Sequence, residues 1–130
     1  MNETAPTFKR IATLDVSTVL LLISREQPFT INDIVISTGS PRLRTYLKGT
    51  TCPTCGLVGS FFAVEATKPN YVDYHLNLYA RDQAGNEVPM SSDHIHPRSC
   101  GGGGSLRNRQ PMCRPCNIAK GATIQPPKSS

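Results

Sequence analysis

The sequence predicts a small α+β domain held together by zinc, with a mostly helical segment in front of it. Two sequence patterns predict the domain: residues 74–80 alternate between apolar and polar side chains as a strand does, and two Cys-x-x-Cys pairs flank that region. Helix-start signals within residues 1–50 predict the helical segment. The chain has 130 residues, which allows one domain with a modest hydrophobic core. The cysteine pairs are Cys52/Cys55 and Cys113/Cys116.

The N-terminal segment, residues 1–50, is expected to begin with a frayed end over its first ten residues. Asp15 or Ser17 can cap a helix that contains the apolar residues of 19–23. Such a helix would bury one apolar face.

A second short helix is expected to begin at Thr30. Asp33 follows three residues later and resembles the acidic partner of a capping box, which marks the start of a helix. This helix is expected to extend to Ser37. Residues 31–36 are rich in β-branched side chains, which can equally form a strand.

A third helix is predicted from Pro41 to Lys48, because Ser40 suits the N-cap and proline suits the first helical position. Arg42 and Arg44 make this helix basic. Together with the preceding element it can form a helix-turn-helix that places Arg42, Arg44 and Lys48 on DNA. The alternative, which we favour, is a helix that packs on the zinc region and keeps its charges in water.

Strands are predicted at 60–65 and 74–80, followed by a hairpin turn at 81–86 and a partner strand at 87–95. Pro97 ends that strand because it has no amide hydrogen to donate.

The C-terminal part is expected to continue with a glycine loop at 101–104 and a short strand at 108–112. A short helix over 114–119 would then stop at Gly121. Residues 122–130 are expected to be a disordered tail.

The cysteine pairs favour zinc over disulfides or a redox site. The apolar run 16–23 is too short to span a bilayer and lacks the features of a signal peptide, so we expect an intracellular protein with reduced thiols. Four thiolates form a zinc-selective ligand set. Cys100 is interpreted as an incidental free thiol.

The net charge of +5 is unevenly distributed, because no acidic residue follows Asp93. A stretch of one sign favours a polyanionic partner, and nucleic acid is the natural one, although a basic surface without a partner is the alternative. The candidate phosphate-binding residues are Arg98, Arg107, Arg109, Arg114 and Lys120.

Residues 93–97 read Asp-His-Ile-His-Pro, and after the glycine loop residues 108–117 read Asn-Arg-Gln-Pro-Met-Cys-Arg-Pro-Cys-Asn, with Lys120-Gly121 beyond. This combination resembles the HNH nucleases of the ββα-metal fold, in particular small bacteriophage-encoded members whose paired Cys-x-x-Cys motifs hold a structural zinc. The resemblance covers residues 52–121, so residues 51–121 are expected to form the nuclease domain. If the protein is phage-encoded, it would act in the cytoplasm of a bacterial host.

The resemblance implies a role for each matching position. His94 would be the general base that deprotonates the attacking water, and Asn108 would orient it through the nearby backbone. Asp93 and Asn117 would bind a catalytic Mg²⁺ or Mn²⁺ ion. Asn117 stands where many members of the family have a histidine.

One geometric difficulty concerns Asp93 and His94, because adjacent strand residues point to opposite faces. They can share a site only where the strand twists or ends. His96 is the rival for the role of base, whereas His75 is interpreted as structural.

Two functions therefore stand. The first is a metal-dependent endonuclease that acts on double-stranded DNA and has no membrane partner. The second is a non-catalytic, zinc-stapled DNA-binding or adaptor protein. The base, the two oxygen ligands and the orienting asparagine favour the enzyme.

Overall fold

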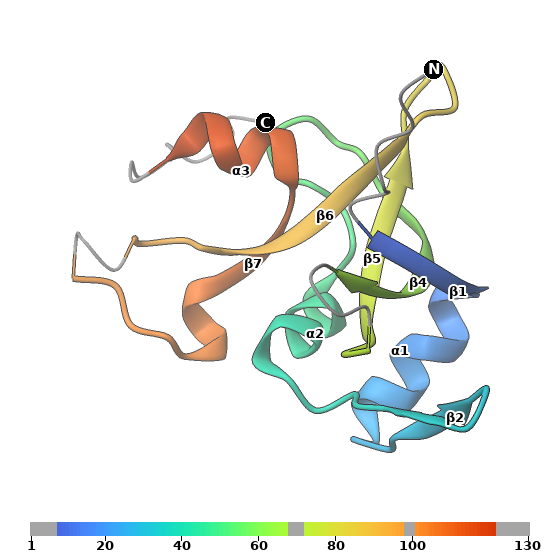
Figure 1. The fold of residues 1–130 in the computed structure, drawn as a ribbon. Helices are drawn as coiled ribbons and strands as arrows, with labels where there is room; N and C mark the ends of the chain where they lie inside the picture. Colours follow the sequence, from blue (N-terminus) through green and yellow to red (C-terminus); the bar gives the residue numbers. More distant parts are fainter. Residues whose placement is uncertain (1–7, 68–71, 98–100, 122–130) are drawn as a thin grey trace.

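A five-stranded antiparallel sheet with strand order β1-β4-β5-β6-β7 organises the chain (Figure 1). The structure is a computed structural model and describes residues 8–67, 72–97 and 101–121. The predicted strands at 60–65, 74–80, 87–95 and 108–112 are confirmed, with ends that differ by a few residues. The strands of the sheet are β1 Phe8–Leu14, β4 Gly59–Thr67, β5 His75–Arg81, β6 Glu87–His94 and β7 Arg109–Cys113.

Strand β6 belongs to two pairings in succession. Its first residues, 87–89, pair with β5, and residues 90–94 pair with β7. The 3-10 turn η3 Leu106–Asn108 leads into β7, and helix α3 Arg114–Lys120 follows it. Figure 1 shows β6 running from the sheet toward β7 and α3. Two antiparallel strands and a helix thus form the predicted ββα unit, and β6 joins it to the sheet.

The N-terminal segment is not mostly helical, so that prediction is wrong. Strand β1 includes residues 8–10, which were expected to fray, and pairs with β4. Residues 1–7 lie outside the described residues. A strand at this position gains its hydrogen bonds from a partner 48 or more residues away, which local patterns do not reveal.

The predicted helix from Thr30 to Ser37 is also wrong, because these residues form a hairpin of β2 Phe29–Ile31 and β3 Ile34–Ile36. Its two turn residues, Asn32 and Asp33, have φ angles of 50° and 63°. Positive φ at both positions is typical of the tight hairpin turn that matches strand twist. The alternative prediction, that the β-branched residues of 31–36 form strand structure, is therefore confirmed.

The two remaining helices of the N-terminal segment are confirmed. Helix α1 Val16–Ser24 is capped by Asp15, whose carboxylate accepts from the amide of Thr18 at 3.1 Å. Helix α2 Pro41–Thr45 is capped by Ser40 and continues into the 3-10 turn η1 Tyr46–Lys48. Because a hairpin precedes α2, the helix-turn-helix hypothesis fails.

The core lies between the sheet and helices α1 and α2. Val19 and Ile23 of α1 are fully buried and belong to one apolar cluster with Phe62 and Leu78 of the sheet. The ring of Tyr46 meets that of Phe62 edge-on at 6.0 Å. The same cluster includes Met112 and Cys113, so the core extends to the end of β7.

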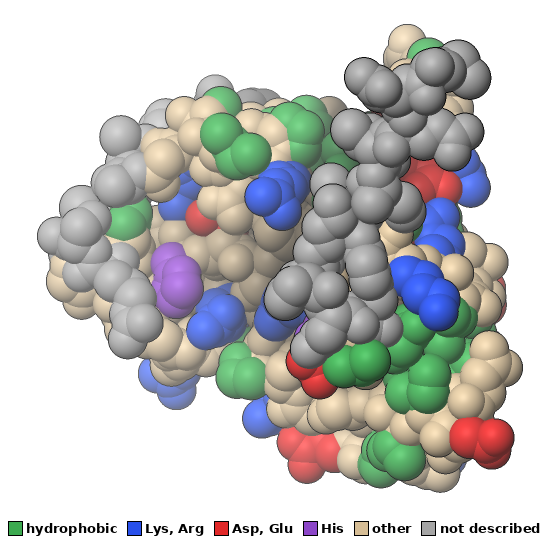
Figure 2. All heavy atoms as spheres, viewed as in Figure 1, with side chains coloured by type: hydrophobic (Ala, Val, Ile, Leu, Met, Phe, Trp, Pro, Cys, Tyr) green, Lys and Arg blue, Asp and Glu red, His purple; other side chains and the backbone are tan. Residues whose placement is uncertain are grey.

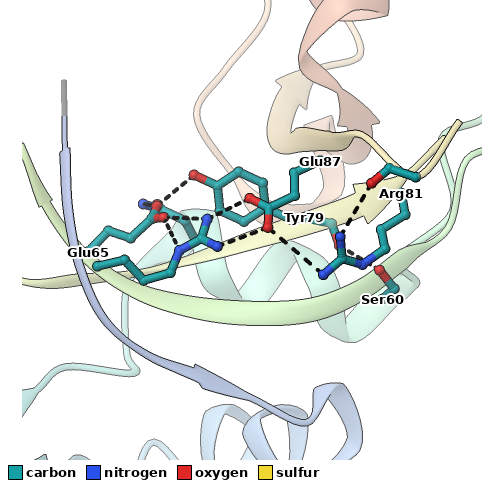
Figure 3. A network of polar contacts seen from close by, with 8 residues as sticks. Ser60, Glu65, Tyr79, Arg81 and Glu87 are labelled. Carbon is teal, nitrogen blue, oxygen red and sulfur yellow. Dashed lines mark hydrogen bonds and ion pairs between the residues drawn. The ribbon is translucent and has the colours of Figure 1, made fainter. Parts of the chain in front are cut away.

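The opposite face of the sheet carries a polar network (Figure 3). The carboxylate of Glu65, only 2% exposed, accepts from the Tyr79 hydroxyl at 2.6 Å and from Arg10 Nε at 2.8 Å. Arg10 also donates to both oxygens of Glu87. Burial, and then the Glu65 carboxylate, raise the pKa of Tyr79 to about 12. These contacts tie β1 to β4, β5 and β6.

Candidate functional site

Four cysteine sulfurs converge where the sheet meets the ββα unit. The Sγ atoms all lie within 4.8 Å of one another, and those of Cys55 and Cys113 are 3.5 Å apart. A tetrahedral zinc with Zn–S bonds of about 2.3 Å separates its sulfurs by about 3.8 Å. The cluster can therefore hold one zinc ion. It consists of Cys52, Cys55, Cys113 and Cys116.

The first cysteine pair lies in a hydrogen-bonded turn, and the second lies at the start of helix α3. In the first loop the amide of Gly56 donates to the carbonyl of Cys52 at 2.9 Å, and Gly56 has a φ of 83° that favours glycine. In the second pair, Cys113 is the N-cap of α3 and Cys116 lies in its first turn. A metal here links the loop before β4 to the junction of β7 and α3.

The thiols differ in acidity before a metal binds. Burial disfavours the Cys52 thiolate, but hydrogen bonds from backbone amides outweigh it and lower the pKa of Cys52 to about 7. Burial and the neighbouring thiols raise the pKa of Cys116 far above its usual value. Zinc binding must therefore release protons from this cluster.

Strand β6 and helix α3 face one another through polar side chains. Asp93 is 5% exposed, and its Oδ2 accepts from Gln110 Nε2 at 3.0 Å and from Lys120 Nζ at 2.9 Å. Asn117, one turn before Lys120, donates from Nδ2 to Ser91 Oγ at 2.9 Å. Ser91 and Asp93 point to the same face of β6, and α3 covers that face. Asp93 therefore lies on the surface of β6 that faces α3, and Asn117 lies on the surface of α3 that faces β6.

The oxygens left free on these two side chains suit a hard cation. Within the described residues no hydrogen bond engages Asp93 Oδ1, and Asn117 uses its nitrogen toward Ser91. A carboxylate oxygen and a carboxamide oxygen are ligands that Mg²⁺ and Mn²⁺ accept. The donor set therefore fits the divalent ion that the resemblance implies.

His94 is the last residue of β6, where strict strand alternation ends. Among the described residues its Nε2 has no hydrogen-bond partner although the atom is buried. An unpaired buried nitrogen costs about 1–3 kcal/mol. The side chain of His96, by contrast, is exposed.

Asn108 holds the backbone that follows β6. Its Oδ1 accepts from the amide of His96 at 2.9 Å, and its Nδ2 donates to the carbonyls of His96 and Gly103 at 3.0 and 2.6 Å. Gly102 lies against the same carbonyl of His96, where a Cβ would clash at 1.7 Å. The loop can therefore close only with glycine at this position.

Helix α2 and turn η1 support the ββα unit from the N-terminal segment. The hydroxyls of Thr45 and Ser92 lie 2.8 Å apart. Lys48 Nζ donates to the carbonyl of Leu106 at 3.2 Å and to that of Arg109. These contacts attach the N-terminal segment to both strands of the unit.

A protein-family model described as HNH endonuclease matches residues 81–123. This segment is thus similar to HNH endonuclease domains, and we refer to it as the HNH domain. It includes β6, β7, α3 and the second cysteine pair, whereas the first pair and helix α2 precede it. No curated protein and no solved structure matches the chain. The family implies a nuclease or nucleic-acid-binding role and a nucleic-acid substrate.

The basic residues of the HNH domain differ in exposure. Arg107 and Arg114 are exposed, whereas Arg109 is partly buried and donates to Ser92. Lys120 was expected at the DNA but is 2% exposed and bonded inside the domain, so it is not available to a phosphate here. Arg98 lies outside the described residues. Figure 2 shows Lys and Arg side chains near a His side chain on the face that Figure 1 assigns to this domain.

Several contacts of the HNH domain were not predicted. Gln110 stands opposite Asp93 in the pairing of β6 and β7, so strand register would have revealed it. Ser91 would have followed from alternation with Asp93. Thr45 and Lys48 carry no sequence signal for their roles, because their partners lie 47 or more residues away.

Within the described ranges, no helix has the length and apolar character needed to cross a membrane.

Proposed function

We propose that this protein is a metal-dependent DNA endonuclease that hydrolyses phosphodiester bonds. The observation that carries the proposal is the arrangement within the HNH domain of Asp93 and Asn117 on facing surfaces of β6 and α3, with His94 at the end of the same strand. The family match supports the reaction class.

The proposed reaction uses His94 as the general base. Its Nε2 is buried but carries no competing hydrogen bond within the described residues, so it would be able to accept a proton from a water that enters the site with the substrate. The water oxygen bonds to phosphorus while the bond from phosphorus to the 3′ oxygen breaks. That oxygen takes up a proton, which leaves 5′-phosphate and 3′-hydroxyl ends.

Asp93 and Asn117 would hold Mg²⁺ or Mn²⁺ through their oxygens. When bound, the ion supplies positive charge that stabilises the phosphate in the transition state. Asn108 positions the backbone beyond His94 through its bonds to His96. The roles divide into proton transfer, ion binding and orientation.

The cysteine cluster would hold zinc as a structural element only. Four thiolates fill a tetrahedral shell and leave no position for water or substrate. In this proposal residues 51–121 are the nuclease domain, and residues 8–50 pack on it without contacting DNA. The contacts of Thr45 and Lys48 support that division.

The second candidate is a zinc-stapled protein that binds DNA without cleaving it. The ion pair of Asp93 with Lys120 favours this candidate, because the carboxylate already has a positive partner. Exposed Arg107 and Arg114 serve binding in either case.

A plasmid-cleavage assay with and without added Mg²⁺ separates the two candidates. His94→Ala is expected to lose at least about 10²-fold in cleavage while keeping its fold, zinc content and DNA affinity. His96→Ala is the matched control and should stay active. If the wild-type protein does not cleave the plasmid with either Mg²⁺ or Mn²⁺, the result would support the second candidate, a protein that binds DNA without cleaving it.

A further inference from the structure

Lys120 is a buried charged residue of the HNH domain that the proposed mechanism does not use. Its side chain is 1% exposed, and its ammonium lies 2.9 Å from Asp93 Oδ2. It also donates to the carbonyls of His94 and Ile95 at 2.6 and 3.4 Å. The ammonium thus binds the backbone of His94 as well as the carboxylate of Asp93.

A buried ammonium in this position has two separable effects. Its hydrogen bonds hold the end of β6, which any suitable donor of similar length can do. Its positive charge partly neutralises Asp93 and repels a second cation at the same carboxylate, strongly so where little water screens it. The second effect opposes the binding of a divalent ion.

We propose that Lys120 is an internal counter-ion of Asp93 that keeps the ligand in place without metal and lowers the affinity of the site for Mg²⁺ or Mn²⁺. This inference depends on the proposed function, because it takes Asp93 as a ligand of the ion. Lys120 is then a positioning residue whose charge makes the protein hold its ion loosely in the absence of DNA.

Two substitutions separate charge from hydrogen bonding. Lys120→Gln removes the charge and keeps a donor, and Lys120→Arg keeps the charge with a different shape. Lys48→Gln is the matched control, because within the described residues Lys48 also donates to two backbone carbonyls but forms no hydrogen bond or ion pair with Asp93. Lys120→Met is a second neutral variant for use if Lys120→Gln does not fold.

We would measure the affinity of the zinc-loaded, DNA-free full chain for Mn²⁺. The spectroscopic signal of free Mn²⁺ reports how much of the ion remains unbound. Circular dichroism and zinc content establish that each variant is folded. We expect Lys120→Gln or Lys120→Met to bind Mn²⁺ at least about tenfold more tightly than the wild type. Lys120→Arg and Lys48→Gln should remain within about threefold of it.

Asp93→Asn in the Lys120→Gln background identifies the site, because it should remove the gained affinity. Equal or weaker Mn²⁺ binding by a folded neutral variant overturns the role of Lys120 and leaves the proposed function standing. If no variant binds Mn²⁺, or if Asp93→Asn leaves binding unchanged, Asp93 is not a metal ligand and both proposals fall. If neither neutral variant folds, Lys120 is required for the fold and the specific effect on affinity is rejected.

Discussion

Thr45 and Ser92 join the N-terminal segment to the strand that carries Asp93 and His94. Thr45 is fully buried, and its hydroxyl lies 2.9 Å from the carbonyl of Pro41 and 2.8 Å from the hydroxyl of Ser92. Since a hydroxyl has one proton, Thr45 donates to Pro41 and accepts from Ser92. Ser92 in turn accepts from Arg109 at 3.2 Å. The chain of hydrogen bonds runs from β7 through β6 into α2.

Replacing Thr45 by valine is expected to destabilise the protein by about 1–3 kcal/mol, because Ser92 loses a buried acceptor while the side-chain shape is conserved. Thr45→Ser keeps the hydroxyl and should recover most of that loss. Urea unfolding of zinc-loaded protein measures both. A Thr45→Val variant as stable as the wild type would show that the contact does not stabilise the fold.

Purified protein is expected to contain about one zinc per chain. A strong chelator should unfold the protein, since metal binding contributes directly to folding free energy in such small sites. Elemental analysis and circular dichroism test this. Cys55→Ser should lose zinc, whereas Cys100→Ser should keep it. Freshly purified, reduced protein that is folded without zinc would contradict the prediction.

Affinity for duplex DNA is expected to depend on Arg107 and Arg114, the exposed arginines of the HNH domain. Replacing each with glutamine should reduce the slope of log affinity against log salt by about 0.9. Arg44→Gln is the control, because Arg44 is exposed on α2 and its ion pair is with Glu26 at 3.7 Å. Fluorescence anisotropy over a salt series measures the slopes.

A slope change of similar size in Arg44→Gln would place α2 at the DNA and contradict its packing role. Lys48→Gln should instead lower stability, since Lys48 donates to the carbonyls of Leu106 and Arg109. The two basic residues of one segment therefore have different expected effects.

The ion pair between Arg10 and Glu87 predicts a dependence of stability on pH. The hydrogen bond from Arg10 lowers the pKa of Glu87 below its ordinary value of 4.5. Because the folded-state pKa is depressed, the stabilisation is complete above about pH 4.5 and is lost as the pH falls through the lowered value.

Glu87→Gln should therefore be less stable than the wild type by up to about 1 kcal/mol at neutral pH. The difference should shrink as the pH falls below 4.5. Unfolding of both proteins at matched pH values measures it, and effects shared by the two, such as loss of zinc, cancel. A difference that stays constant down to pH 3 would show that the carboxylate charge is not responsible.

The sequence by itself determined the elements whose signals are local. Ser40 followed by Pro41 predicted the start of α2, and Gly121 predicted the end of α3, because capping depends on neighbouring residues alone. Alternating side chains located the central strands. The spacing of the cysteines predicted the metal cluster, since that ligand set has few other uses in a reduced chain.

Tertiary structure decided the elements that depend on distant partners. Strand β1 exists because β4 supplies its hydrogen bonds, and residues 29–36 form a hairpin whose local pattern also permitted a helix. Lys120 looked like a residue for binding phosphate until packing of α3 on β6 placed its ammonium against Asp93. Propensities of single residues differ by about 1 kcal/mol or less, whereas burial and long-range pairing contribute several, so packing decides the ambiguous cases.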